Sequence, residues 1–261
     1  MRFNYRKFKK DSEFYNINQY EDNGVFVYRN LFEDKIIAKI KKELNKIIDK
    51  KNKLKIRKRD INLVKNKVNS MHGLTKYNKY FKKLSKNKNL INICEIALKN
   101  KPIFREAEYF AKPKSIGLKS PFHQDNFYWN IIDGKALTVW VALDNTNKLN
   151  GNIRYFLKSH KLGTIKHIDS MAPGSSQMIS KKKINLLKKK FKEISIDLRP
   201  GDALIHSCEI IHGSQPNKSN FSRRGLTFQF NAKGSKIDEL RKKKYLRSLY
   251  CQIKNRGNSK N

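Results

Sequence analysis

The hydrophobic period of this sequence changes near residue 103, and that change constrains the fold more than any other feature. Before it, apolar residues recur every three or four positions, as in helices; after it, they fall into short runs that suit β-strands. The runs cover residues 103–111, 136–143, 152–157, 194–198, 203–207, 210–213 and 225–230. Turn-forming pairs such as Asp133-Gly134 and Asn150-Gly151 separate them. Short strands at this spacing predict a mainly β fold, a sandwich or barrel with flanking helices.

Helices are expected mainly in the first hundred residues. The apolar positions of an amphipathic helix there are Ile37, Ile40, Leu44 and Ile47. A second helical segment covers about 88–99, whereas residues 50–68 are too charged to assign and are interpreted as an exposed loop. Within the β-rich half, a short lysine-rich helix is expected at 181–192, and the tail from residue 236 has the pattern of a last helix.

The sequence has no internal repeat and no linker, so we expect a single domain over residues 1–261. It would consist of a helical N-terminal part over about 1–100, a β core over about 101–235 and a basic C-terminal tail over 236–261. Because 38% of the residues are hydrophobic, the chain can bury a core of ordinary size.

Membrane and secreted proteins are disfavoured classes. No segment reaches the roughly 18–20 apolar residues of a membrane span, and the start of the chain lacks the apolar run of a secretory signal. The cysteines Cys94, Cys208 and Cys251 are odd in number and far apart, which favours a reducing compartment over a disulfide framework. We therefore expect a cytoplasmic protein.

The formal net charge is +37, from 59 Lys+Arg against 22 Asp+Glu. Such a charge attracts polyanions, so RNA, DNA and anionic surfaces are candidate partners. The excess is spread along the whole chain, however, and most of the cations are lysines rather than the arginines that suit phosphates and base edges. We interpret the charge mainly as solvated lysines, and nucleic-acid binding stays an alternative.

Two short motifs in the β-rich half carry residues that can bind a metal. In the segment FHQD, His123 and Asp125 are two residues apart and share a face if the segment is a strand. In the segment IHGS, His212 comes from another predicted strand, and His206 just before it is the rival ligand. Two imidazoles and one carboxylate on one side of a metal are the ligand set of non-haem Fe(II) oxygenases.

Arg223 follows His212 beyond the turn segment SQPNKSNFS. If an antiparallel hairpin forms around that turn, Arg223 returns beside His212. A guanidinium there could bind a carboxylate with two hydrogen bonds and hold one end of a dicarboxylate that chelates iron with its other end. Arg224 should face the opposite way.

In order and spacing, these motifs resemble the phytanoyl-CoA dioxygenase family of Fe(II)/2-oxoglutarate oxygenases. The resemblance covers about residues 20–232. It runs through the blocks NGVFVYRNLFEDKIIAKIKKEL, Lys112-Pro113 ahead of HQDNFYW, TVWVALDNTNKLNGNIRYFLKSHKLG, RPGDALIHSCEIIHGSQPN and the final arginine, Arg223. It implies a double-stranded β-helix core, a cupin-like jelly roll, with flanking helices.

The resemblance also implies roles for individual residues. His123, Asp125 and His212 match the family's iron ligands, and Arg223 matches the arginine that pairs with the distal carboxylate of the co-substrate 2-oxoglutarate. Trp140 matches a tryptophan that lies near the co-substrate in some members. The implied reaction uses dioxygen, releases succinate and CO2, and hydroxylates a small organic molecule. Asp125 favours hydroxylation, because halogenating relatives have a small residue in its place.

One departure from the family pattern is Lys158, at a position where glycine is common, so the loop geometry there is not carried over. The substrate stays open. An acyl-CoA substrate has no support in the sequence, and the basic character favours an anionic small molecule. Two alternatives remain: a nucleic-acid demethylase of the same superfamily, and a basic nucleic-acid-binding protein without catalysis.

Overall fold

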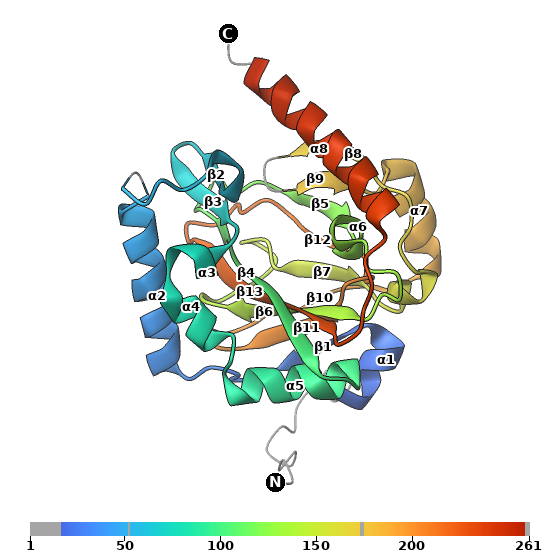
Figure 1. Ribbon diagram of the computed structural model, residues 1–261, viewed down its shortest axis with the longest axis horizontal. Coiled ribbons are helices and arrows are strands. Elements are labelled where there is room, and N and C mark those ends of the chain that lie inside the picture. The colour runs from blue at the N-terminus through green and yellow to red at the C-terminus, as the bar shows by residue number, and fades with distance from the viewer. Residues whose placement is uncertain (1–16, 52, 173–174, 259–261) are drawn as a thin grey trace.

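The computed structural model describes residues 17–51, 53–172 and 175–258 (Figure 1). The helices are α1 (Tyr20–Asn23), α2 (Asp34–Asp49), α3 (Leu74–Tyr77), α4 (Lys79–Leu84), α5 (Lys88–Leu98), α6 (Asn126–Trp129), α7 (Lys181–Lys190) and α8 (Glu239–Asn258), with short 3₁₀ helices η2 (Ile17–Gln19), η3 (Lys58–Asp60) and η4 (Ser159–Leu162). The strands are β1 (Val25–Tyr28), β2 (Ile61–Val64), β3 (Lys67–Met71), β4 (Pro102–Lys112), β5 (Ser120–His123), β6 (Ala136–Ala142), β7 (Ile153–Phe156), β8 (Ile168–Ala172), β9 (Ser175–Met178), β10 (Glu193–Ser195), β11 (Ala203–Ser207), β12 (His212–Ser214) and β13 (Arg223–Ala232).

Two antiparallel sheets form the β part. The larger has the strand order β1-β11-β6-β13-β4-β3-β2, the smaller has the order β10-β7-β12-β5, and β8 and β9 form a separate hairpin. Buried apolar residues of β1, β6 and β11 pack with those of β7 in one cluster, so that cluster lies between the two sheets. This is the architecture of a jelly roll, and the predicted double-stranded β-helix with flanking helices is confirmed.

Helices cover the outer face of the larger sheet (Figure 1). The four apolar positions predicted for the first amphipathic helix are all buried on α2, in the same cluster as residues of α4, α5 and the sheet. Along β6, Val139 and Val141 belong to this helix-facing cluster, whereas Trp140 belongs to the cluster between the sheets. The alternation follows from the two-residue period of a strand, and it decides which side chains reach the interior of the jelly roll.

Two hairpins lie where the sequence predicts no strands. The segment interpreted as an exposed loop contains β2, and β2 and β3 extend the larger sheet at its edge. Lys65 and Asn66 make the turn with φ of 45° and 62°, the pair of positive values typical of tight hairpins. β2 is only the four-residue run INLV, and basic residues flank it rather than alternate with its apolar residues, so no two-residue period is recognisable; this explains the wrong prediction. The hairpin of β8 and β9 is also absent from the sequence-based expectation.

Candidate functional site

Three side chains predicted to bind a metal lie together inside the jelly roll. His123 ends β5, His212 begins β12, and the two strands pair so that these residues are directly opposite each other. Asp125 lies just beyond β5, and one potential ligand atom from each of the three residues falls within 4.8 Å of the others. The register of β5 and β12 therefore explains why the two imidazoles meet.

Asp125 does not share a strand with His123, so that prediction is wrong, although the Asp125 side chain joins the cluster. Asp125 has φ −60° and ψ −35° and is the residue that caps α6. The backbone therefore leaves the extended conformation after His123, and the start of a helix, rather than strand alternation, directs the carboxylate. Asp125 Oδ1 lies 3.7 Å from His123 Nε2 and 3.6 Å from His212 Nε2.

The imidazoles are oriented by backbone carbonyls. His123 Nδ1 lies 2.8 Å from the Pro121 carbonyl oxygen, and His212 Nδ1 lies 3.1 Å from that of Ile210. Because a carbonyl only accepts, each Nδ1 carries the proton and each Nε2 presents its lone pair to the cluster. Carbonyl oxygens commonly fix metal-binding histidines in this way.

The protonation states also suit a divalent metal. Burial, the largest effect, lowers the pKa of His123 and of His212 to about 4, so both imidazoles are neutral near pH 7. Burial alone would raise the pKa of Asp125, but the surrounding imidazoles, His212 first, outweigh it and lower that pKa. Neutral imidazole and ionised carboxylate are the forms that bind metals. The donor set therefore fits an Fe(II) ion of the kind the sequence predicts.

Arg223 reaches the same interior from the larger sheet. The predicted hairpin between the strands of His212 and Arg223 is wrong, because β12 pairs with β5 and β7 whereas β13 pairs with β4 and β6. Arg223 is buried, its Nε and Nη2 donate to the Gly151 carbonyl oxygen at 3.1 and 2.7 Å, and its Cζ lies 5.1 Å from the Trp140 ring centroid. Its neighbour Arg224 faces the other way, as predicted, and binds Asp144 with two hydrogen bonds.

Lys112 is a second buried cation, which the sequence argument missed as a site residue. It is the cross-strand partner of Arg223 and only 5% exposed, and its Nζ donates to the Leu118 carbonyl oxygen. Burial, and after it the charge of Arg223, lowers the pKa of Lys112, and burial lowers that of Arg223 to about 10. No carboxylate among the described residues forms a salt bridge with either side chain. The sequence signal for Lys112 is its place in the Lys112-Pro113 block that resembles the family.

The buried Lys112 predicts a pH effect on the ligand-free protein. Its pKa is lower in the folded state than in the unfolded chain, so the unfolded chain binds more protons between the two values. The folded state is therefore penalised at neutral pH, and stability rises as the pH approaches 10.5. We expect the free energy of unfolding, measured with urea at several pH values, to rise less with pH in Lys112→Met than in the wild type. An equal rise in both proteins would contradict the lowered pKa of Lys112.

Gly225 makes room for Trp140 beside Arg223. A Cβ at Gly225 would lie 2.0 Å from Trp140 Cζ2, so any larger residue must displace the indole. We expect Gly225→Ala to lower the free energy of unfolding by about 1–3 kcal/mol and to change tryptophan fluorescence. Gly163→Ala is a comparison for the fluorescence only: its added Cβ has no atom within 4 Å and leaves Trp140 in place, but its φ of 63° strains any larger residue and lowers stability by itself. Unchanged unfolding and fluorescence in Gly225→Ala would show that the Trp140 position is not constrained.

Two further histidines and a tyrosine lie close to the candidate ligands. His167 is buried and accepts a hydrogen bond from the Gln124 backbone N–H at 3.0 Å, so it holds the backbone between His123 and Asp125. His206 lies beside the cluster, with Nε2 3.3 Å from Asp125 Oδ2. Tyr128, on α6, packs edge to face against His123 with 5.8 Å between the ring centroids, and Tyr245 of α8 packs against Tyr128.

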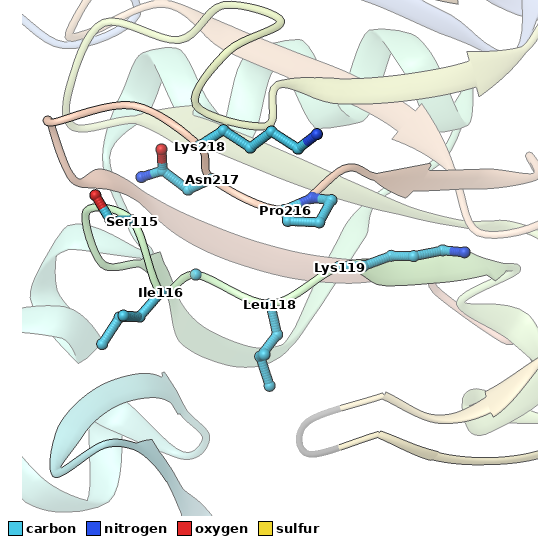
Figure 2. Close-up of a pocket in the computed structure, with 8 residues that line it drawn as sticks. Ser115, Ile116, Leu118, Lys119, Pro216, Asn217 and Lys218 are labelled. Carbon is cyan, nitrogen blue, oxygen red and sulfur yellow. The ribbon is translucent and has the colours of Figure 1, made fainter.

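A pocket of about 600 Å³ lies outside this cluster, between two loops (Figure 2). It is lined by Ser115, Ile116, Gly117, Leu118, Lys119, Pro216, Asn217 and Lys218. The Asn217 backbone N–H fixes the two loops to each other by donating to the Gly117 carbonyl oxygen at 2.9 Å. None of the clustered histidines or Asp125 lines it, so this pocket is separate from the candidate metal centre.

The loop at Lys158 explains the departure from the family pattern. Lys158 has φ 65°, in the left-handed region where glycine is the easiest residue. The chain therefore keeps the backbone conformation that a glycine would adopt, and Lys158 Nζ pairs with Asp22 at 2.7 Å.

Residues 20–225 match the family model described as Phytanoyl-CoA dioxygenase (PhyH), so the chain belongs to the phytanoyl-CoA dioxygenase family. It is 28% identical over 161 residues to phytanoyl-CoA dioxygenase domain-containing protein 1 of Danio rerio and 25% identical over 161 residues to phytanoyl-CoA dioxygenase 1 of Oryza sativa subsp. japonica. Each alignment covers 60% of this chain and 54% of the relative, so the chain spans about half the length of these curated relatives.

Solved structures share the fold at low identity. EctD from S. alaskensis, crystallised with 2-oxoglutarate and 5-hydroxyectoine, superposes with a TM-score of 0.72 at 17% identity, covering 85% of this chain and 77% of EctD. The alpha-ketoglutarate-dependent carbocyclase SnoK from nogalamycin biosynthesis gives a TM-score of 0.69 at 13% identity, covering 88% and 87%. Within the described residues, no helix has the length and apolar character needed to cross a bilayer.

Proposed function

We propose that this protein is an Fe(II)- and 2-oxoglutarate-dependent dioxygenase that hydroxylates a small organic molecule and releases succinate and CO2. His123, Asp125 and His212 would hold the iron, and Arg223 and Lys112 would bind the distal carboxylate of 2-oxoglutarate. Family membership and the relatives crystallised with iron or with 2-oxoglutarate support this assignment.

The observation that carries the proposal is the spacing of two sites along β6. Thr138 Oγ1 donates to Asp125 Oδ2 at 2.7 Å, and two residues later Trp140 packs against Arg223. Residues two apart on a strand share a face and lie about 7 Å from each other. A five-carbon dicarboxylate can span such a distance, with its oxo-acid end at the metal cluster and its distal carboxylate at Arg223.

The buried cations support the same assignment. Lys112 and Arg223 are adjacent, buried and without a carboxylate partner among the described residues, and such charges are costly unless a ligand neutralises them. A guanidinium binds a carboxylate with two parallel hydrogen bonds, whereas the Lys112 ammonium adds a point charge. Together they would orient 2-oxoglutarate and exclude dicarboxylates of other lengths.

The chemistry would be divided between cofactor and protein. A bound ferrous ion supplies the activation of dioxygen and the oxidation of an unreactive C–H bond. The protein's residues hold neutral imidazoles and an ionised carboxylate toward that ion, anchor the co-substrate and keep the interior dry. Hydroxylation is the proposed outcome because Asp125 retains the carboxylate; SnoN and SnoK, described as an epimerase and a carbocyclase, show that the fold also occurs with other outcomes.

The substrate is proposed to be an anionic small molecule, because the net charge of +37 would attract it electrostatically. The test is a panel of anionic and neutral compounds screened by oxygen uptake with Fe(II) and 2-oxoglutarate at several salt concentrations. We expect anionic compounds to stimulate uptake and the stimulation to fall as salt rises. Equal stimulation by neutral compounds would contradict the electrostatic argument.

Succinate formation tests the proposed reaction itself. Wild-type protein with Fe(II), ascorbate and 2-oxoglutarate should form succinate, and formation should stop when a chelator removes the iron. A metal-independent shift of DNA or RNA without any succinate would instead favour the non-catalytic nucleic-acid-binding alternative.

A further inference from the structure

We propose that Thr138 and His206 are positioning residues that hold one oxygen of Asp125 and so reserve the other for the metal. This inference rests on the proposed function and concerns which carboxylate oxygen is free. The two oxygens of Asp125 have different surroundings. Oδ1 faces the two imidazoles, with 3.7 and 3.6 Å to their Nε2 atoms, whereas Oδ2 faces the larger sheet.

Two hydrogen-bond donors meet at Oδ2. Thr138 Oγ1, on β6, donates to it at 2.7 Å, and His206 Nε2, on β11, approaches it at 3.3 Å. Thr138 and His206 are direct cross-strand partners, so the pairing of β6 with β11 places both donors side by side. Both residues are nearly inaccessible to solvent, at 3% and 1% exposed, so water does not compete for this oxygen.

A tyrosine from the opposite sheet fixes the ring of His206. An ionised carboxylate only accepts hydrogen bonds, so His206 Nε2 must carry the proton that faces Oδ2. His206 Nδ1 and the Tyr155 hydroxyl form the second hydrogen bond of the ring at 3.0 Å. Tyr155 is on β7 and fully buried, and its ring also stacks on His212. The hydrogen bonds from Tyr155 to His206 and from His206 to Asp125 thus connect the two sheets beside the candidate metal ligands.

The hydrogen bonds at Oδ2 limit how the Asp125 carboxylate can bind a metal. With Oδ2 occupied, Asp125 would bind a metal through Oδ1 alone. A carboxylate that binds through one oxygen takes one ligand position and leaves the others open for the co-substrates. His206 is also excluded as the third ligand by this arrangement, because its Nε2 proton is directed at the carboxylate. Residues that orient metal ligands typically change metal affinity by 10–100-fold when they are lost.

Metal binding, rather than activity, gives the test. The full-length protein, freed of metal, is titrated with Co(II), and both the dissociation constant and the visible absorption of the bound ion are measured. Thr138→Val keeps the side-chain shape and removes the hydroxyl, and Thr138→Ser retains it. His206→Leu removes the ring donors, and His206→Gln retains an N–H donor. Tyr155→Phe removes only the hydroxyl that fixes the ring.

Thr138→Val and His206→Leu should each weaken Co(II) binding about 10–100-fold and alter its absorption spectrum. Thr138→Ser and His206→Gln should recover most of the loss, and Tyr155→Phe should have a smaller effect of the same kind. Wild-type Co(II) affinity and spectrum in both Thr138→Val and His206→Leu would overturn the inference, even if their melting temperatures fell. If the wild type itself bound no Co(II), the proposed function would fail together with it.

Discussion

Arg223→Met is expected to raise the KM for 2-oxoglutarate about thirtyfold or more. Removing one partner of a buried, hydrogen-bonded charge pair costs about 2–5 kcal/mol, and the distal carboxylate would lose its two-pronged partner. The same variant should raise the melting temperature of the ligand-free protein, because it replaces a buried cation without a carboxylate partner by an apolar side chain. Succinate formation at varied 2-oxoglutarate and thermal unfolding without ligand measure the two effects.

Arg224→Met is the matched control for this prediction. Arg224 is the next residue on β13 but binds Asp144 on the outer side of the sheet. We expect its loss to lower the melting temperature and to leave the KM for 2-oxoglutarate unchanged. If Arg224→Met changed the KM as much as Arg223→Met, or if Arg223→Met left it unchanged, the assignment of the co-substrate carboxylate to Arg223 would be wrong.

His123→Ala and His212→Ala are each expected to abolish iron-dependent succinate formation, by about a thousandfold or more. Each variant leaves one imidazole and one carboxylate, and a ferrous ion loses a ligand of the facial set. The iron bound per protein after anaerobic loading and desalting should fall in parallel. His160→Gln is the control, because His160 bonds to the Glu21 carbonyl oxygen and is not one of the clustered ligands, so this variant should retain full iron content. Full iron content in His123→Ala would exclude His123 as a ligand.

The metal cluster could be predicted from sequence because it depends on spacing. His123 and Asp125 are two residues apart in the chain, and His212 is placed by a motif, so their meeting needed only the correct fold. The prediction that Asp125 shares a strand face with His123 is wrong, because the start of α6 sets the backbone of Asp125 at φ −60°. The three predicted residues therefore lie together in the structure, but with a local geometry at Asp125 that differs from the prediction.

The position of Arg223 shows why sequence spacing was insufficient. A short spacing between two strand residues suggests a hairpin, but in this jelly roll the chain crosses from the smaller sheet to the larger one between β12 and β13. Arg223 reaches the interior from its own sheet, and its cross-strand partner on β4 becomes visible only with the register. The roles of Lys112, Thr138 and His206 likewise depend on pairings between segments distant in sequence. The sequence singles out Lys112 only as part of a family block and His206 only as a rival ligand, and it gives no signal for Thr138.

The most direct measurement of the central claim is an anaerobic absorption titration. A 2-oxo acid chelated to protein-bound Fe(II) gives a visible charge-transfer band, which requires the metal cluster and the co-substrate site together. We expect the band in the wild type on adding both Fe(II) and 2-oxoglutarate, no band with either alone, no band in His123→Ala, and in Arg223→Met a band only at much higher 2-oxoglutarate. A folded wild-type protein that gives no band with both present would contradict the account.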